Sequence, residues 1–134
     1  MLTPENAYLK SPVVIWQRAE ALLIFITAIF VFCYFNDVIP WWGSLLLFLA
    51  PDISFIGYIV GPKIGAFCYN AAHVYGLGIL LFAIGMILHY PWCMLIGSLW
   101  LAHSGFDRML GYGLKSPEGF SFTHLGMIGK QPKE

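Results

Sequence analysis

This sequence contains few charged residues. Only 10% of its 134 residues are Asp, Glu, Lys or Arg, and none of these occurs between Lys63 and Asp107. Soluble globular domains carry about 25% charged residues, so the composition excludes an ordinary soluble enzyme. Seven basic residues balance seven acidic ones. The chain therefore has neither the basic excess that binds a nucleic-acid backbone nor the one-sided charge of many disordered segments.

Cysteine is also scarce. The three cysteines, Cys33, Cys68 and Cys93, are an odd number and show no Cys-x-x-Cys spacing. This pattern provides neither a disulfide framework nor a thiolate metal site. We expect three apolar thiols without a covalent role.

Apolar residues are abundant instead, with 59% hydrophobic and 17% aromatic residues. A helix of about 20 residues crosses the ~30 Å hydrocarbon core of a bilayer. Turns near residues 36–40 and 89–91 divide the chain into four apolar segments. These are roughly 13–35, 38–60, 64–88 and 91–112. We therefore predict an all-α, four-transmembrane-helix bundle over residues 1–112, followed by a Gly-rich tail over residues 113–134.

The basic residues predict the orientation of this bundle. All seven lie before or early in the first segment, between the second and third segments, or at or after the end of the fourth. They are Lys10, Arg18, Lys63, Arg108, Lys115, Lys130 and Lys133. By the positive-inside rule, both termini and the loop between the second and third segments face the cytoplasm. The aromatic residues Trp41, Trp42, Tyr90 and Trp92 would then lie at the outer interface.

Three ionisable residues on different helices are predicted to lie at one depth. Asp52 is about nine residues before the inner end of its segment, His73 about nine after the start of the next, and His103 about nine before the end of the last. At about 1.5 Å per residue, all three lie roughly 13 Å inside the cytoplasmic boundary. We expect them to converge on one buried polar pocket.

Asp107 and Arg108 add two charges to the fourth segment. Together they would cost about 5–7 kcal/mol at the middle of a membrane helix, which exceeds the ~2–4 kcal/mol that the Leu, Ile and Phe residues of that segment supply. They must therefore point into the bundle or reach its interface. Helical spacing places His103 and Asp107 on one face, and Tyr69, Asn70 and His73 on another.

Pro51 predicts a kink in the second helix, because proline removes a backbone donor and frees the carbonyl of Leu47. A broken helix at membrane depth requires protein or water to satisfy its exposed groups. The kink therefore suggests a cavity lined by Asp52 and Ser54. The alternative is a simple proline kink in which Asp52 pairs with Arg18.

Four motifs carry a family resemblance. They are Ala-Pro-Asp-Ile-Ser-Phe-Ile-Gly-Tyr (50–58), Tyr-Asn-Ala-Ala-His (69–73), Ala-His-Ser-Gly-Phe-Asp-Arg-Met-Leu-Gly-Tyr-Gly-Leu-Lys (102–115) and Thr-His-Leu-Gly (123–126). Over residues 17–130 the chain resembles the bacterial membrane family known as domain-of-unknown-function 4260. The resemblance implies a small multi-pass protein of the bacterial inner (cytoplasmic) membrane, whose direct partner is the lipid bilayer. It implies no activity, substrate or cofactor.

A metal-dependent membrane enzyme is the first functional hypothesis. Imidazole and carboxylate groups suit a divalent metal such as Zn, Mn or Fe, and an open position on the metal would activate water. The candidate metal ligands are His73, His103 and Asp107, completed by Asp52 or His124. Candidate catalytic bases are Asp52 and Glu20, and candidate cofactor-binding residues are Tyr69, Asn70 and Arg108. A substrate at this depth would be lipid-like.

Two alternatives stay open at this point. His73 and His103, at equal depth on neighbouring helices, would also suit the axial ligands of a haem or pigment. A non-catalytic accessory or assembly subunit of a larger membrane complex is the other alternative, because the buried charges can balance each other. The acidic set is Glu20, Asp52 and Asp107, and the basic set is Arg18, Lys63 and Arg108.

Overall fold

The computed structural model describes residues 11–129. The predicted basic positions Lys10, Lys130 and Lys133, and the last residues of the predicted tail, lie outside this range. The helices, in chain order, are α2 (Pro12–Phe35), α3 (Trp41–Leu49), the 3-10 helix η1 (Ala50–Ile59), α4 (Pro62–His73), α5 (Tyr75–Ile87) and α6 (Pro91–Leu110). Three short strands follow them: β1 (Lys115–Ser116), β2 (Gly119–Thr123) and β3 (Gly126–Met127).

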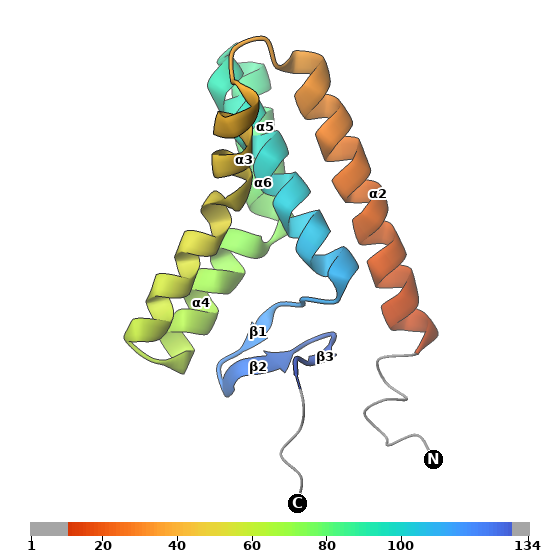
Figure 1. Cartoon of the computed structure of the whole chain (residues 1–134), viewed down its shortest axis with the longest axis vertical. Coiled ribbons are helices and arrows are strands. Elements are labelled where there is room, and N and C mark those ends of the chain that lie inside the picture. Colours follow the sequence, from red (N-terminus) through yellow and green to blue (C-terminus); the bar gives the residue numbers. More distant parts are fainter. Residues whose placement is uncertain (1–10, 130–134) are drawn as a thin grey trace, which may run out of the picture.

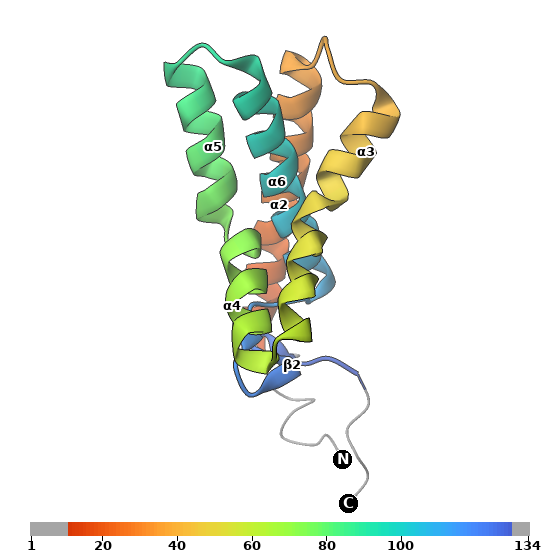
Figure 2. The same cartoon turned by 90° about the vertical axis from the view of Figure 1, so that its left-hand side faces the viewer.

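Helix α6 is the centre of the fold. Ten of its 20 residues are buried, and it packs mainly against α2 and α5 and also against α3 (Figures 1 and 2). Glycines permit this close packing, because a Cβ at Gly97 would lie 2.5 Å from the backbone nitrogen of Phe82, and one at Gly105 would lie 2.9 Å from that of Phe25. Such small residues are typical of interfaces between membrane helices.

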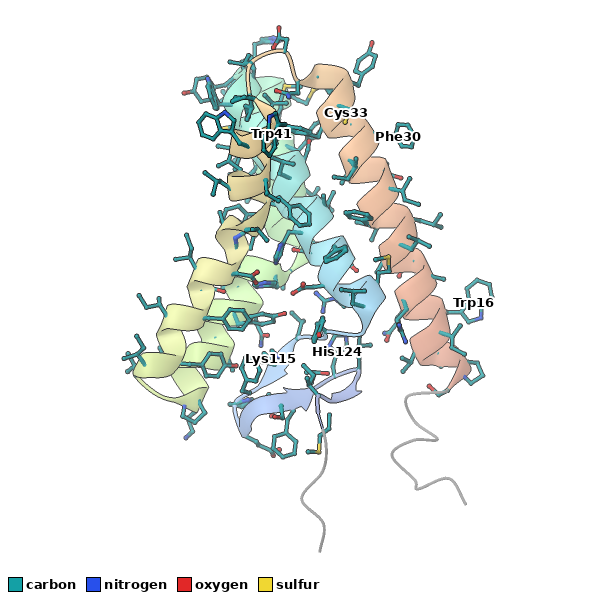
Figure 3. The ribbon with its side chains drawn as sticks, viewed as in Figure 1. Trp16, Phe30, Cys33, Trp41, Lys115 and His124 are labelled. Atoms are coloured by element: carbon teal, nitrogen blue, oxygen red, sulfur yellow. The ribbon has the colours of Figure 1, made fainter. Side chains whose placement is uncertain are left out.

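The outer surface of the helices is apolar. The helix α2 and the continuous segment Trp41–Ile59 are each long and apolar enough to cross a membrane, and the pair α4 and α5 forms a third candidate span. Trp16 and Phe30 on α2 are 75% and 72% exposed and point away from the other helices (Figure 3). A surface this rich in exposed large hydrophobic side chains indicates a membrane protein.

Pro51 changes the type of the second helix. The Ala50 N–H donates to the Leu47 carbonyl, in the tighter i to i+3 pattern, and the 3-10 helix η1 continues for ten residues. With about 3.0 residues per turn, residues three apart share a face. Asp52, Phe55 and Tyr58 are therefore aligned, and Phe55 packs against Tyr69 of α4 at 5.2 Å between ring centroids.

The third predicted segment is not one straight helix. α4 and α5 are bent by 43° relative to each other, and Val74 between them has extended backbone angles (φ −75°, ψ 140°). The expectation of a continuous helix over residues 64–88 needs this correction. His73 is consequently the last residue of a helix and lies directly at the break.

The expectation of an all-α chain also needs correction. The tail forms a three-stranded antiparallel sheet in the order β1-β2-β3, which packs against α4. Gly111 ends α6 in the left-handed conformation (φ 98°), which a glycine adopts without steric cost. The Asn70 side chain fastens β1, since its amide donates to the Lys115 carbonyl (2.8 Å) and accepts from the Lys115 N–H (2.6 Å).

Candidate metal centre

Four predicted site residues meet at one point. Asp52 comes from η1, His73 from the end of α4, and His103 and Asp107 from α6. Each offers one ligand atom, and these atoms all lie within 4.8 Å of one another. The prediction that Asp52, His73 and His103 converge is confirmed. The histidines are only 1% and 2% exposed, whereas the Asp52 and Asp107 side chains are 39% and 18% exposed. The group is therefore closed on its imidazole side and open on its carboxylate side.

Five distances within the group are close to the edges of a metal coordination shell. The two histidine Nε2 atoms are 3.1 Å apart. His73 Nε2 lies 3.4 Å from Asp52 Oδ1 and 3.5 Å from Asp107 Oδ2, and the corresponding distances from His103 Nε2 are 3.3 and 3.8 Å. A regular tetrahedron with bonds of about 2.0–2.1 Å has edges of about 3.3–3.4 Å. Four ligand atoms are thus arranged around a space that suits one metal ion.

His73 is held in one orientation by α4. Its Nδ1 lies 2.8 Å from the Tyr69 carbonyl oxygen, which can only accept, so Nδ1 carries the proton. The lone pair of Nε2 therefore faces the group. The Tyr69 ring stacks on the imidazole at 3.7 Å, and its hydroxyl donates to Asp107 Oδ2 at 2.8 Å. Contacts of this kind orient metal ligands and tune their affinity.

The helix break at Val74 is stabilised by α6. The end of α4 has carbonyl groups without helical partners, and α6 provides donors for two of them. Trp100 Nε1 donates to the Ala72 carbonyl at 2.6 Å, and Arg108 Nη2 donates to the His73 carbonyl at 2.8 Å. The buried Arg108 guanidinium thus donates to one backbone carbonyl, and this hydrogen bond helps to position His73.

His103 is supported less completely. Its Nε2 faces the group and its ring meets the edge of Phe48 at 5.2 Å. Its buried Nδ1 has no hydrogen-bond partner among residues 11–129. Metal-binding histidines usually donate this second N–H to an acceptor, so His103 departs from that pattern.

The sequence matches the family model described as Domain of unknown function (DUF4260) over residues 14–128. The chain belongs to this family. Neither the curated proteins nor the solved structures that were compared include a match. The family description assigns no activity.

The other residues that the sequence analysis assigned to the site are not among the four candidate ligands. His124 accepts a hydrogen bond from the Leu114 N–H through Nδ1 (2.8 Å) and lies, with Glu20 and Arg108, on a separate pocket. Neither His124 nor Glu20 joins the four-residue group. Asn70 fastens β1 to α4, whereas Tyr69 contacts the centre directly.

Lys115 is a neighbour of the centre that the sequence reasoning did not assign. It is only 4% exposed, and its Nζ lies 4.0 Å from the Phe120 ring centroid and 5.1 Å from that of Tyr69. Burial lowers the pKa of the Lys115 amine, while the charge of Asp107 acts in the opposite direction. Lys115 lies between the helices and the sheet (Figure 3), and the two hydrogen bonds between the Asn70 side chain and the Lys115 backbone hold it there. Lys115 is the last residue of the motif over residues 102–115, and its place in that motif is the sequence feature that could have marked it as a site residue.

Proposed function

We propose that this protein binds one divalent metal ion through Asp52, His73, His103 and Asp107, and uses it for hydrolysis or related chemistry on a lipid-like substrate. One observation carries the proposal. Five distances among the ligand nitrogen and oxygen atoms that η1, α4 and α6 contribute fall between 3.1 and 3.8 Å, around buried imidazoles. Two carboxylates balance the charge of a divalent ion, and this mixed nitrogen and oxygen set suits Zn, Mn or Fe.

Acceptor crowding supports a cation at this point. His73 Nε2 is an acceptor, and ionised Asp52 and Asp107 have only acceptors. A proton on His103 Nε2 can form a hydrogen bond to one of these three acceptors. The other two acceptors then lie close together without a donor between them. A metal ion is attracted to all four groups at once. This is why a purely structural histidine pair is the weaker interpretation.

The same distances argue against the haem alternative. Two axial histidines on opposite sides of an iron, each with a bond of about 2.0 Å, hold their Nε2 atoms about 4 Å apart with a macrocycle between them. Here the two atoms are 3.1 Å apart, and Asp52 and Asp107 share the same space. The geometry suits neighbouring positions on one small ion.

An accessory subunit would be supported if each buried acidic residue paired with a basic residue. The described residues do not form such pairs. Within residues 11–129, every ion pair is a His–Asp contact of the centre. Arg18 donates to the Met109 carbonyl at 2.9 Å and Arg108 to the His73 carbonyl, so neither neutralises a carboxylate. The acidic groups of the centre are left for another cation.

The open carboxylate side supports catalysis. A metal with a free coordination position lowers the pKa of bound water and provides a nucleophile. Asp52 is the more exposed of the two carboxylates, so it is the ligand that would leave a coordination position for water and would then be available as the base. Lys115, close to Asp107, would stabilise negative charge that develops on a substrate. The apolar surroundings favour a substrate that approaches through the membrane.

We also propose four spans with both termini in the cytoplasm of a bacterial inner membrane. α6 is about 30 Å long, as expected for a span. Its central position explains why it needs less apolar surface than α2. The start of α2, the turn between η1 and α4, the end of α6 and the sheet all lie at one end of the molecule (Figure 1). Arg18, Lys63, Arg108 and Lys115 occur in these parts, which supports a cytoplasmic assignment of that end.

Elemental analysis of the detergent-purified protein tests the metal centre. We expect about one metal ion per chain, and its loss in His73→Ala and His103→Ala. His124→Ala is the matched control, since it removes a histidine outside the group and should retain the metal. Full metal occupancy in either ligand variant would reject the proposed ligands.

Catalysis requires a second measurement. Wild-type protein in vesicles should release water-soluble or lysolipid products from added lipids, as detected by mass spectrometry. Chelation and the His103→Ala change should both stop this release. Metal binding without any product from a broad set of lipids would restrict the function to metal binding.

A further inference from the structure

A second polar pocket lies at the cytoplasmic side of the metal centre. It is formed by the first half of α2, the helix break, the end of α6 and the tail, and has a volume of about 280 Å³. Glu20, Tyr75, Arg108 and His124 are among the residues that line it. It adjoins the centre through the chain, because Val74 follows His73 and Arg108 follows Asp107, but it shares no ligand atom with the centre.

Arg108 gives this pocket a buried positive charge. The residue is only 7% exposed, and its Nε has no hydrogen-bond partner among the described residues. The guanidinium lies 5.2 Å from the Tyr75 ring centroid and donates through Nη2 to a carbonyl. No carboxylate within residues 11–129 pairs with it, as the ion pairs show. A buried guanidinium with unused donor capacity favours binding of an oxyanion such as phosphate.

Glu20 places a negative charge on the same pocket. It is exposed and forms no ion pair with any residue in the described part of the chain. A simple anion would be attracted by Arg108 and repelled by Glu20. A ligand that carries both a phosphate and an ammonium group would be attracted by both residues. The two charges therefore select a zwitterion over an anion of similar size.

The depth of the pocket matches the headgroup region of a bilayer. Trp16 lies one turn before Glu20 on α2 and is 75% exposed, and exposed tryptophans are enriched at membrane interfaces. Residues 21–35 of the same helix contain no charge. The rim of the pocket therefore lies where the polar part of the lipid meets the hydrocarbon.

We propose that this pocket binds a phosphoethanolamine group, with the phosphate at Arg108 and the ammonium at Glu20. The group could belong to a phosphatidylethanolamine lipid or to a soluble phosphoethanolamine. The proposal does not depend on the metal, because none of the residues that carry it belongs to the metal centre.

Binding to the full-length protein in detergent, measured by native mass spectrometry, tests this proposal. The probes are phosphatidylethanolamine, phosphatidylglycerol with the same acyl chains, and soluble phosphoethanolamine. We expect wild-type protein to prefer phosphatidylethanolamine over phosphatidylglycerol about tenfold, since one charge-assisted contact distinguishes them. Competition by soluble phosphoethanolamine would identify a soluble ligand, and binding of the lipid alone would identify the lipid. Either result supports the shared chemistry.

Glu20→Gln is the decisive variant, because it changes an exposed side chain and should leave the fold intact. We expect it to reduce the preference to less than about twofold. Glu118→Gln, an exposed glutamate in the turn between β1 and β2, removes the same charge elsewhere and should retain the preference. Chelated wild-type protein should also retain it, which separates this proposal from the metal centre. Equal binding of both lipids to wild-type protein, or an unchanged preference in Glu20→Gln, would overturn the proposal.

Discussion

Tyr69 allows a sharp test of the metal centre without removing a ligand. Its hydroxyl donates to Asp107 Oδ2 at 2.8 Å, while its ring stacks on His73 at 3.7 Å. Tyr69→Phe removes the hydrogen bond and retains the ring. Loss of such an outer contact typically weakens metal binding by about 10- to 100-fold, or roughly 1.4–2.7 kcal/mol. We expect this decrease in Zn²⁺ affinity, measured by competition with a fluorescent chelator.

Tyr58→Phe is the matched control. Tyr58 is a second tyrosine, on η1, that packs against Phe55 and Phe120, but its buried hydroxyl has no hydrogen-bond partner within the described residues. Removing that hydroxyl should leave metal affinity unchanged, and it should leave the thermal stability equal or higher, because an unsatisfied buried group is lost. Equal affinities for Tyr69→Phe and wild-type protein, or an equal loss in Tyr58→Phe, would refute the reasoning about the Asp107 contact.

Three further predictions concern the framework around the centre. Trp100→Phe removes the donor to the Ala72 carbonyl and leaves it buried and unpaired, so thermal unfolding in detergent should show a loss of about 1–3 kcal/mol. Gly97→Ala should lower the unfolding temperature because its Cβ would lie 2.5 Å from the Phe82 backbone nitrogen, and a serine at the same position should be worse. Burial and the nearby arginine hold the pKa of His124 below its usual value of 6.5. The neutral form therefore favours the folded tail above that pH, and the contribution is lost as the pH falls below 6.5, because the unfolded tail then binds more protons. The protection factors of the strand amides, which are exchange rates corrected for the intrinsic rate at each pH, should decrease with falling pH in wild-type protein and respond less in His124→Gln, and equal pH profiles would contradict this assignment.

The positions of the ligands could be predicted because they follow from local helical geometry. His103 and Asp107 are separated by one turn, and the depth of each residue follows from its distance to the end of its segment. Asp52 and His73 required only the assumption that neighbouring helices are antiparallel. The meeting of the four ligands could therefore be predicted from the spacing of these residues along the chain.

The helix break at Val74 could not be predicted in the same way. The break contains no proline, and its stabilisation comes from the side chains of Trp100 and Arg108 on a helix distant in sequence. Tertiary hydrogen bonds thus override the apolar continuity of the segment. The sheet was missed for a related reason, since its strands are short and β1 is positioned by the Asn70 amide on α4.

The 3-10 geometry that follows Pro51 also changes how far the chain reaches. A 3-10 helix rises about 2.0 Å per residue, where an α-helix rises about 1.5 Å. The segment Trp41–Ile59, with 19 residues, would extend only about 28 Å as a pure α-helix. With its second half in the tighter winding, it extends about 33 Å and can traverse a hydrocarbon layer of about 30 Å. One proline thereby adds a few ångströms of length to an otherwise short segment, and replacing it should draw both ends toward the bilayer midplane.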